Sequence, residues 1–365
     1  MKLTAEREAL LKPLQAVIGV VERRQTMPIL SNVLLKAGDG QLSVTGTDLE
    51  VELIAEADVD VADPGDITVP GRKLHDIVRA LPDGVTVELI HTGDRVSVKA
   101  GRSRFVLSSL PAADFPSTEG VDADRELTVS YADLRRLIDK THFSMAQQDV
   151  RYYLNGLLIE TEGSRLRAVA TDGHRLALAD CELASPAGRD GQSIVPRKGV
   201  LELNRLLGGD GELQLVLSAN HLRVQLPGIR LTTKLIDGRF PDYGRVVPQH
   251  SEHILRADRE ALRSALQRAA ILSNEKYRGI RLELGENRLV MQANNPEQEE
   301  ATEELEVEYG GPEMEIGFNV SYLLDALGAV ESETVELGLS DANSSCLITN
   351  AADAQTKFVV MPMRL

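Results

Sequence analysis

An internal repeat constrains the fold of this chain more than any other feature. A three-residue motif follows a strand-like run in each copy: GTD at 46–48, ATD at 170–172 and ANN at 293–295, which are 124 and 123 residues apart. A period of this length indicates repeated domains and not the short units of a solenoid. The sequence therefore predicts three divergent copies of one domain.

Three other anchors keep the same spacing. Each copy begins with a helical pattern (EREALLKPLQAVI, SYADLRRLIDKTHF, DREALRSALQRAAIL) and has a strand entering an amphipathic helix in its middle (ITVPGRKLHDIVRAL, SIVPRKGVLELNRLL, IGFNVSYLLDAL). Each copy closes with a related strand (RFVLSSLPAADFP, IRLTTKLIDGRFP, TKFVVMPMRL). Alternating runs separated by GD and DG turns indicate antiparallel strands. We expect an α+β fold of three domains, each with two helices on an antiparallel sheet, at 1–124, 125–251 and 252–365.

Composition narrows the functional classes. The two cysteines, Cys181 and Cys346, are far apart and lack metal-type spacing, so we expect reduced thiols and no metal site. The sequence also has no phosphate-cradling or dinucleotide-binding motif, so we expect no cofactor. The first residues mix charge into every turn and no apolar run is long enough to span a bilayer, which favours a cytoplasmic protein without a membrane partner.

Charge is unevenly distributed along the chain. The formal net charge is -16, which argues against tight pairing with phosphates. The helical segments 7–24, 72–80, 133–140, 197–206 and 258–268 nevertheless hold 16 Lys or Arg against 8 Asp or Glu. Helix surfaces often carry Lys and Arg, but the segregation also fits a protein that surrounds nucleic acid without gripping it.

The motif AVATDGHRLALA, at 168–179, resembles a catalytic loop because Asp172, His174 and Arg175 lie within four residues. The Thr-Asp pair recurs in copy one without a histidine, so a repeated turn, with side-chain oxygens bonding backbone amides, explains Asp172 better than acid–base catalysis. No P-loop, dinucleotide fingerprint or nucleophile elbow supports an enzyme. We expect no catalytic residue.

The quoted segments carry a family resemblance. PILSN, LPAADFP, FSMAQQDVRYYLNG, VATDGHRLA, VPRKG, DGRFPDY, RAAILSNEKYRG, NNPEQEEA and VVMPMRL are long, unusual words spread over the full chain. Together they resemble the bacterial DNA polymerase III beta subunit family, the sliding clamps. The resemblance implies the DNA clamp fold and a head-to-tail homodimeric ring of six domains around double-stranded DNA. It also implies a processivity role, with the polymerase III alpha subunit, the clamp loader, other polymerases and repair proteins as partners.

The resemblance implies three sets of site residues. A hydrophobic cleft between copies two and three would bind partner peptides through Leu154, Thr171, Gly173, His174, Arg175, Leu176, Pro241, Arg245, Val246, Asn319, Tyr322, Asn343, Ser345, Val359, Met361, Pro362, Met363 and Arg364, with Asn343 in place of an expected apolar residue. DNA contacts would come from Arg24, Gln148, Arg151, Tyr152, Tyr153, Arg197, Lys198 and Tyr277. The ring would close through Phe105 and Leu107 on one side and Ile271 and Leu272 on the other.

Some alternatives stay open from the sequence. One tyrosine of the Tyr152–Tyr153 pair could face a core, and Ile271 and Leu272 could be ordinary core residues. An acid–base enzyme using Asp172 and His174 and a monomeric three-domain scaffold that binds no DNA are the competing functions.

Overall fold

The computed structural model describes residues 1–22, 27–118, 120, 122–350 and 352–364. Its contacts divide the chain into two compact units: unit 1 holds residues 1–131 and 198–235, and unit 2 holds residues 132–197 and 236–365. Copy two is thus shared between the units, so the sequence repeats and the compact units are different divisions of the chain.

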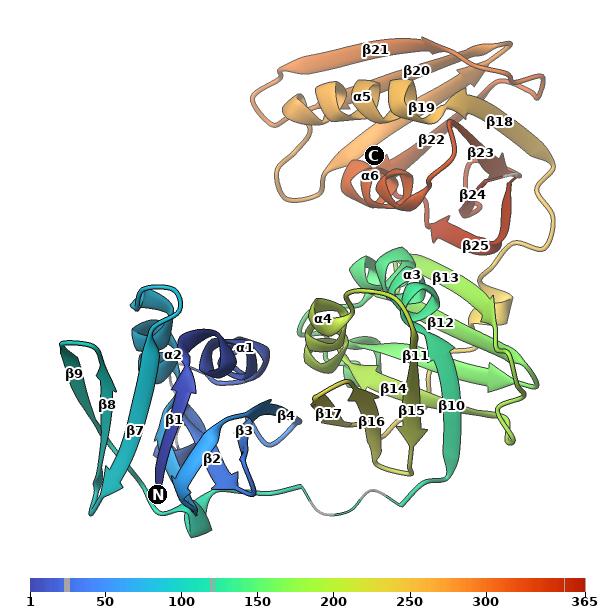
Figure 1. Cartoon of the computed structure of the whole chain (residues 1–365). Coiled ribbons are helices and arrows are strands. Elements are labelled where there is room, and N and C mark those ends of the chain that lie inside the picture. The colour runs from blue at the N-terminus through green and yellow to red at the C-terminus, as the bar shows by residue number, and fades with distance from the viewer. Residues whose placement is uncertain (23–26, 119, 121, 351, 365) are drawn as a thin grey trace. The chain divides into compact units, whose positions relative to one another are not determined.

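The two helices of each copy occur where the repeat predicts them (Figure 1). They are α1 (Arg7–Val17) and α2 (Gly71–Ala80) in copy one, α3 (Tyr131–Thr141) and α4 (Arg197–Leu206) in copy two, and α5 (Arg259–Ala269) and α6 (Val320–Ala329) in copy three.

Helix α5 illustrates how the sequence specifies these elements. The side chain of Asp258 accepts a hydrogen bond from the Ala261 backbone N–H (2.7 Å), which caps the first turn. Leu262, Leu266 and Ala269 are buried, and their spacing places them on one helical face. That face packs against β20 (Arg288–Asn294) and β21 (Glu300–Glu306).

All strand pairs in the described residues are antiparallel, as the alternating patterns predict. Unit 1 contains a five-stranded sheet, β5-β1-β7-β8-β9, and an eight-stranded sheet, β10-β15-β16-β17-β4-β3-β2-β6. Its strands are β1 (Lys2–Glu6), β2 (Asn32–Gly38), β3 (Gln41–Thr47), β4 (Val51–Asp58), β5 (Asp60–Asp63), β6 (Gly65–Pro70), β7 (Thr86–Thr92), β8 (Arg95–Ala100), β9 (Ser103–Ser108), β10 (Arg125–Ser130), β15 (Glu212–Leu217), β16 (His221–Leu226) and β17 (Ile229–Lys234).

Unit 2 contains a second eight-stranded sheet, β14-β11-β12-β13-β25-β24-β23-β18, and a four-stranded sheet, β21-β20-β19-β22. Its remaining strands are β11 (Gly156–Glu162), β12 (Arg165–Thr171), β13 (Arg175–Glu182), β14 (Gly191–Pro196), β18 (His253–Asp258), β19 (Gly279–Gly285), β22 (Met314–Asn319), β23 (Thr334–Leu339), β24 (Cys346–Asn350) and β25 (Asp353–Val360).

The sheets extend across the copies, which differs from one self-contained sheet per copy. Each copy divides its strands between two sheets, and each eight-stranded sheet joins four strands of one copy to four strands of the next. The joining pairs are β4 with β17 in unit 1 and β13 with β25 in unit 2. Pairing of this kind satisfies backbone groups that an isolated copy would leave exposed at a sheet edge.

Candidate functional site

The turn at 171–175 is a structural turn, as the repeat predicts. The Thr171 hydroxyl accepts a hydrogen bond from the Gly173 N–H (3.1 Å), and the Asp172 carboxylate accepts from the N–H groups of His174 (2.9 Å) and Arg175 (3.0 Å). Gly173 has a φ of +89°, which glycine adopts without a steric penalty.

Copy one builds the same turn, and copy three builds an altered one in which the side chain bonds a residue four positions on. In copy one the Thr47 hydroxyl and the Asp48 carboxylate accept from the N–H groups of Leu49, Glu50 and Val51. In copy three the side-chain oxygen of Asn295 accepts from the Glu299 N–H (2.9 Å).

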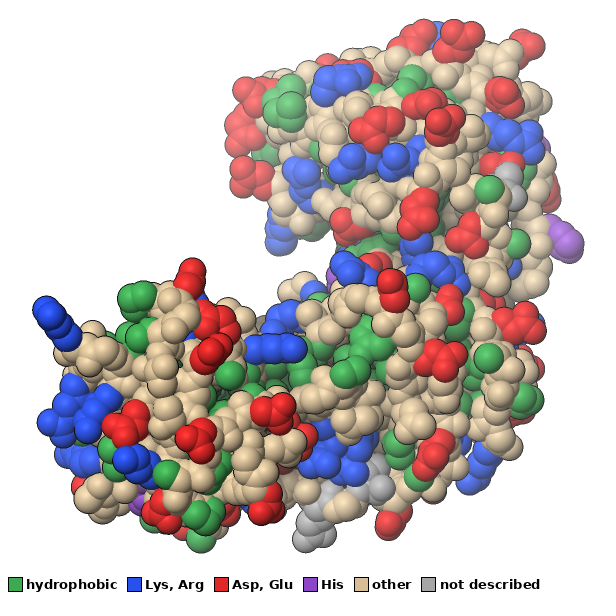
Figure 2. Space-filling view, in the orientation of Figure 1, with side chains coloured by type: hydrophobic (Ala, Val, Ile, Leu, Met, Phe, Trp, Pro, Cys, Tyr) green, Lys and Arg blue, Asp and Glu red, His purple; other side chains and the backbone are tan. Residues whose placement is uncertain are grey.

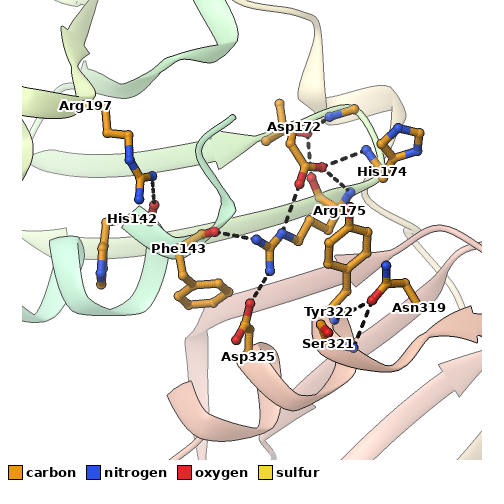
Figure 3. Close-up of polar contacts among 12 residues, drawn as sticks. His142, Phe143, Asp172, His174, Arg175, Arg197, Asn319, Ser321, Tyr322 and Asp325 are labelled. Atoms are coloured by element: carbon orange, nitrogen blue, oxygen red, sulfur yellow. Dashed lines mark hydrogen bonds and ion pairs between the residues drawn. The ribbon is translucent and has the colours of Figure 1, made fainter. Parts of the chain in front are cut away.

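Arg175 connects this turn to two other elements (Figure 3). Its guanidinium donates to Asp172 (3.1 Å), to Asp325 on α6 (2.5 Å) and to the carbonyl of Phe143 (2.6 Å). It also stacks on the Tyr322 ring, 4.5 Å from the centroid. Only 13% of the Arg175 side chain is exposed. Arg175 therefore braces copy two against copy three and presents little surface to a ligand.

His174 differs from its two neighbours because it is exposed. Its backbone N–H is held by Asp172, while its ring points away from that carboxylate (Figure 3). Among the described residues no hydrogen bond joins the His174 ring to Asp172. An Asp–His acid–base pair is thus not assembled here.

An apolar cluster is built on the strands that flank this turn. Of the candidate cleft residues, Leu176 and Val359 are buried in it, and half-buried Val246 packs against it. Its other buried members, which the sequence did not single out, are Leu158, Val169, Leu178, Ile194, Phe240 and Val247. They come from β11, β12, β13, β14 and the segment after β17.

The C-terminal segment runs beside the turn. Strand β25 pairs with β13, with Val359 opposite Leu176, and the Met361 N–H then donates to the His174 carbonyl (2.9 Å). The Met363 N–H donates to the Gly317 carbonyl (2.8 Å). Met361, Pro362 and Met363 are half-buried, so they expose flexible apolar surface next to His174.

The remaining cleft candidates fall into two groups. Leu154 is buried, and the Asn319 side chain caps α6 by accepting from the N–H groups of Ser321 and Tyr322. Exposed or half-exposed positions are Pro241, Arg245, Asn343, Ser345 and Arg364. Residues of the first group stabilise the fold around the site, and those of the second group provide side chains that a ligand can reach.

The candidate DNA-contacting loop lies next to the same turn. Arg151 forms a two-point ion pair with Asp149 (3.0 and 2.8 Å) and donates to the Asp172 carbonyl (3.3 Å). These hydrogen bonds from Arg151 lower the pKa of the Asp149 carboxyl to about 2. A Cβ at Gly173 would be 3.0 Å from the Arg151 guanidinium, so this arginine packs on the turn.

The two tyrosines of that loop have different environments. Tyr152 is 57% exposed, whereas Tyr153 packs against the apolar cluster, so one of the pair does face a core. Gln148 is exposed and has a φ of +58°.

The other DNA candidates are scattered. Lys198 forms ion pairs with Glu22 and Asp48 of copy one, and an Arg197 N–H donates to the His142 carbonyl (3.5 Å). Tyr277 is 57% exposed. Arg24 lies outside the described residues.

Part of the helical positive charge is used inside the protein. Arg205 donates to the carbonyls of Gln15 and Ala16, and Lys140 contacts the Ala329 carbonyl and Glu331. Other Lys and Arg side chains remain on the surface, including some over α3 between acidic groups (Figure 2).

The candidate ring-closing residues lie on an edge strand and in the turn that follows a helix. Phe105 is 37% exposed on β9, an edge strand, and Leu107 of the same strand is 8% exposed. Ile271, just after α5, is 75% exposed and Leu272 is half-buried. Ile271 is therefore not an ordinary core residue.

Two classes of feature are not found in the part of the chain that the structure describes. No group of three or more His, Cys, Asp or Glu side chains is arranged to hold a metal ion. No helix there is long and apolar enough to cross a membrane.

Comparison with known proteins agrees with this architecture. Family models of the DNA polymerase III beta subunit match residues 1–119 (N-terminal domain), 128–242 (central domain) and 244–364 (C-terminal domain). The beta sliding clamp of Pseudomonas aeruginosa is 56% identical over 367 residues, covering all of both chains.

Two solved structures from Pseudomonas aeruginosa also match this chain. The DNA polymerase III subunit beta of Pseudomonas aeruginosa superposes with a TM-score of 0.97 at 55% identity, and a sliding clamp bound to griselimycin with 0.96 at 56% identity. Both matches cover all of both chains.

The three copies and their continuous sheets define a three-domain DNA clamp fold. The chain belongs to the DNA polymerase III beta subunit family, the sliding clamps that serve as polymerase processivity factors.

Proposed function

We propose that two copies of this chain join head to tail in a ring around duplex DNA and tether the replicative polymerase and other partners without doing chemistry themselves. The ring acts in the cytoplasm, and each protomer contributes the three domains 1–124, 125–251 and 252–365. The observation that carries this proposal is that two strands, β9 and β21, each have one unpaired side at the edge of a sheet in the part of the chain that the structure describes, although their equivalents in the other copies pair with each other.

The chain contains two internal examples of a junction between copies. In unit 1, Leu53 of β4 lies opposite Leu231 of β17. In unit 2, Ala177 of β13 lies opposite Phe358 of β25. The sequence repeat makes Leu53 equivalent to Ala177 and Leu231 equivalent to Phe358, so both junctions use the same strands in the same register.

The third pair of equivalent strands lies at sheet edges. Copy one contributes β9, at the end of the five-stranded sheet, and copy three contributes β21, at the end of the four-stranded sheet. Exposed apolar groups accompany them: Val106 on β9 is 51% exposed and Ile271 is 75% exposed. Long unpaired edges with apolar groups favour pairing with another chain. Two head-to-tail pairings of this kind close a ring.

Charge complementarity supports the same contact. Arg95 and Arg104 lie on β8 and β9, whereas β21 carries Glu300, Glu303, Glu304 and Glu306. Opposite charges on facing surfaces favour the head-to-tail arrangement and oppose like-with-like pairing.

The ring explains how an acidic protein keeps hold of DNA. Strong pairing with phosphates would hinder sliding, and a net charge of -16 does not favour such pairing. In a closed ring, topology retains the DNA, and Gln148, Arg151, Tyr152, Tyr153, Arg197, Lys198 and Tyr277 need only guide it. Arg24 has the same proposed role.

Partner peptides would dock where His174, the apolar cluster and Met361 to Met363 meet. Aliphatic and methionine side chains accept apolar anchors, and His174 and Arg245 provide polar contacts at the rim. Asn343, which is exposed before β24, would change the preference at one edge.

A register-specific crosslink tests the ring. Transfer of the internal register places Phe105 opposite Ala301 of the partner subunit. A chain carrying Phe105→Cys and Ala301→Cys should form a disulfide-linked dimer on mild oxidation, because opposite residues in an antiparallel pair have the Cα separation that a disulfide needs. The control, Phe105→Cys with Glu303→Cys, is out of register and should crosslink far less. Equal crosslinking of both variants, or none, would contradict the proposed interface.

A further inference from the structure

The segment after β17 provides one wall of the proposed docking surface and contains a side chain with an unexplained network. Tyr243 lies in a short 3-10 helix, Tyr243–Arg245, and the N–H groups of Val246 and Val247 donate to its carbonyl (3.0 and 3.1 Å). The position of Tyr243 therefore fixes the position of Val246 on the apolar cluster.

Four side chains from three strands and this segment interlock. Arg167 of β12 grips Asp180 of β13 with two hydrogen bonds (2.6 and 2.9 Å) and donates to the Tyr243 hydroxyl (3.0 Å). The Tyr243 hydroxyl in turn donates to Glu160 of β11. The Arg167 guanidinium also lies 5.8 Å from the Tyr243 ring centroid. All four side chains are partly buried, where charge-assisted hydrogen bonds are strong.

The protonation states suit these hydrogen bonds. Burial and the hydrogen bond to Glu160 raise the pKa of the Tyr243 hydroxyl to about 12, so it remains a donor at neutral pH. The hydrogen bonds to Asp180 and Tyr243 raise the pKa of Arg167, which stays charged.

The network is specific to copy two. Strand register makes Lys36, Ser43 and Glu56 the copy-one equivalents of Glu160, Arg167 and Asp180. Alignment of DFPST with RFPDY makes Thr118 the equivalent of Tyr243.

Copy one therefore lacks the arginine and the tyrosine. Copy three has Val290 at the arginine position, by the same register argument. Among the described residues the network occurs only in copy two, the copy that carries the turn at 171–175, so the fold that the copies share does not depend on it.

We propose that Glu160, Arg167, Asp180 and Tyr243 are positioning residues that hold the 241–247 segment in the conformation that binds partner peptides. This proposal rests on the docking surface proposed above. The four side chains act through Pro241 and Val246 and need not touch the ligand themselves. Loss of the Tyr243 hydroxyl would let the segment sample other positions, and a bound ligand would dissociate faster.

Griselimycin, which is bound to a sliding clamp of Pseudomonas aeruginosa in a solved structure, serves as the ligand that tests the proposal. With the full-length protein, calorimetry measures its affinity and surface plasmon resonance measures its dissociation rate. Tyr243→Phe keeps the ring and removes the hydroxyl, and we expect an affinity loss of about fivefold, mostly in the dissociation rate. Glu160→Gln should cause a similar loss of affinity. The double variant should lose little more than either single variant, because both substitutions weaken the same hydrogen bond between Tyr243 and Glu160.

Two controls separate the outcomes. Tyr309→Phe removes a hydroxyl that donates to the Pro312 carbonyl in copy three and should leave griselimycin affinity unchanged. Val246→Asp, within the proposed wall, should abolish binding. If Val246→Asp abolishes binding but Tyr243→Phe and Glu160→Gln stay within twofold of the unaltered protein, the positioning role is wrong and the docking surface stands. If Val246→Asp also binds normally, both proposals are wrong.

Discussion

At the scale of single residues, the motif TDGHR divides into a structural part and an exposed part. Asp172 and Arg175 use their polar atoms on backbone groups and on each other, and Arg175 also reaches Asp325, 150 residues away in sequence. His174 makes no such side-chain contact in the described residues and faces outward. The three side chains that suggest catalysis therefore do different things.

This division predicts the effect of substitutions on stability. Asp172→Ala removes the acceptor of two backbone N–H groups and of the Arg175 guanidinium, so we expect the free energy of unfolding to fall by about 1–3 kcal/mol. His174→Gln should change it by less than about 0.5 kcal/mol, because the residue is exposed. Urea unfolding monitored by circular dichroism measures both. A His174→Gln cost equal to that of Asp172→Ala would contradict the division.

At the scale of helices and strands, the sheet that joins copies two and three holds both cysteines. Cys181 lies in β13 and Cys346 in β24, on either side of β25. Burial raises the pKa of each thiol to about 12, from an ordinary value of 9.0. Both thiols are thus protonated and covered in the folded protein at neutral pH.

Thiol chemistry should therefore report opening of this sheet. At pH 8 we expect both thiols to react with Ellman's reagent only as fast as the sheet opens, and rapidly in urea. Unfolding releases thiols of pKa near 9.0, so the free energy of unfolding should fall as pH rises from about 9 towards 12 and show no thiol effect below that range. The Cys181→Ala, Cys346→Ala double variant should have a shallower fall. Complete labelling of the folded protein within seconds at pH 8 would contradict the burial of these thiols.

Sequence patterns predict the helices and strands better than they predict which strands pair with each other. Helix positions, the three turns and antiparallel pairing follow from local spacing and capping, as Asp258 and Asn319 illustrate. Alternation does not say which strand lies beside which, so the β4–β17 and β13–β25 junctions are not visible in it.

The candidate site shows the same limit. Family resemblance supplies His174 and Val246, but the hydrogen-bond partners of Tyr243 lie 76 and 83 residues away and no local pattern connects them. The DGRFPDY segment contains the tyrosine, yet only the strand register shows what it contacts. Similarly, the basic count of the helices does not show that Lys198 forms ion pairs with Glu22 and Asp48, which weaken its pull on phosphate to the guiding role proposed above.

At the scale of the whole molecule, the proposed retention on DNA depends on closure of a ring. The same strand junction occurs twice within the chain, as β4 with β17 and as β13 with β25. The equivalent strands β9 and β21 lie at sheet edges, each with its outer side unpaired among the described residues. Two chains complete six domains, with no free junction left. Retention on DNA then needs no strong local affinity, in keeping with an acidic protein.

The most direct test is retention on DNA of different topology. The clamp should be loaded by its clamp loader and ATP onto a nicked circular plasmid, and the bound fraction separated by gel filtration in 0.5 M salt. We predict that the clamp stays with the circular plasmid and is lost within minutes after a restriction enzyme linearises it. The Phe105→Cys, Ala301→Cys ring, crosslinked after loading, should also stay on the circle and leave the linear DNA. Equal retention on circular and linear DNA would show that the protein grips DNA by contact, and would contradict the account.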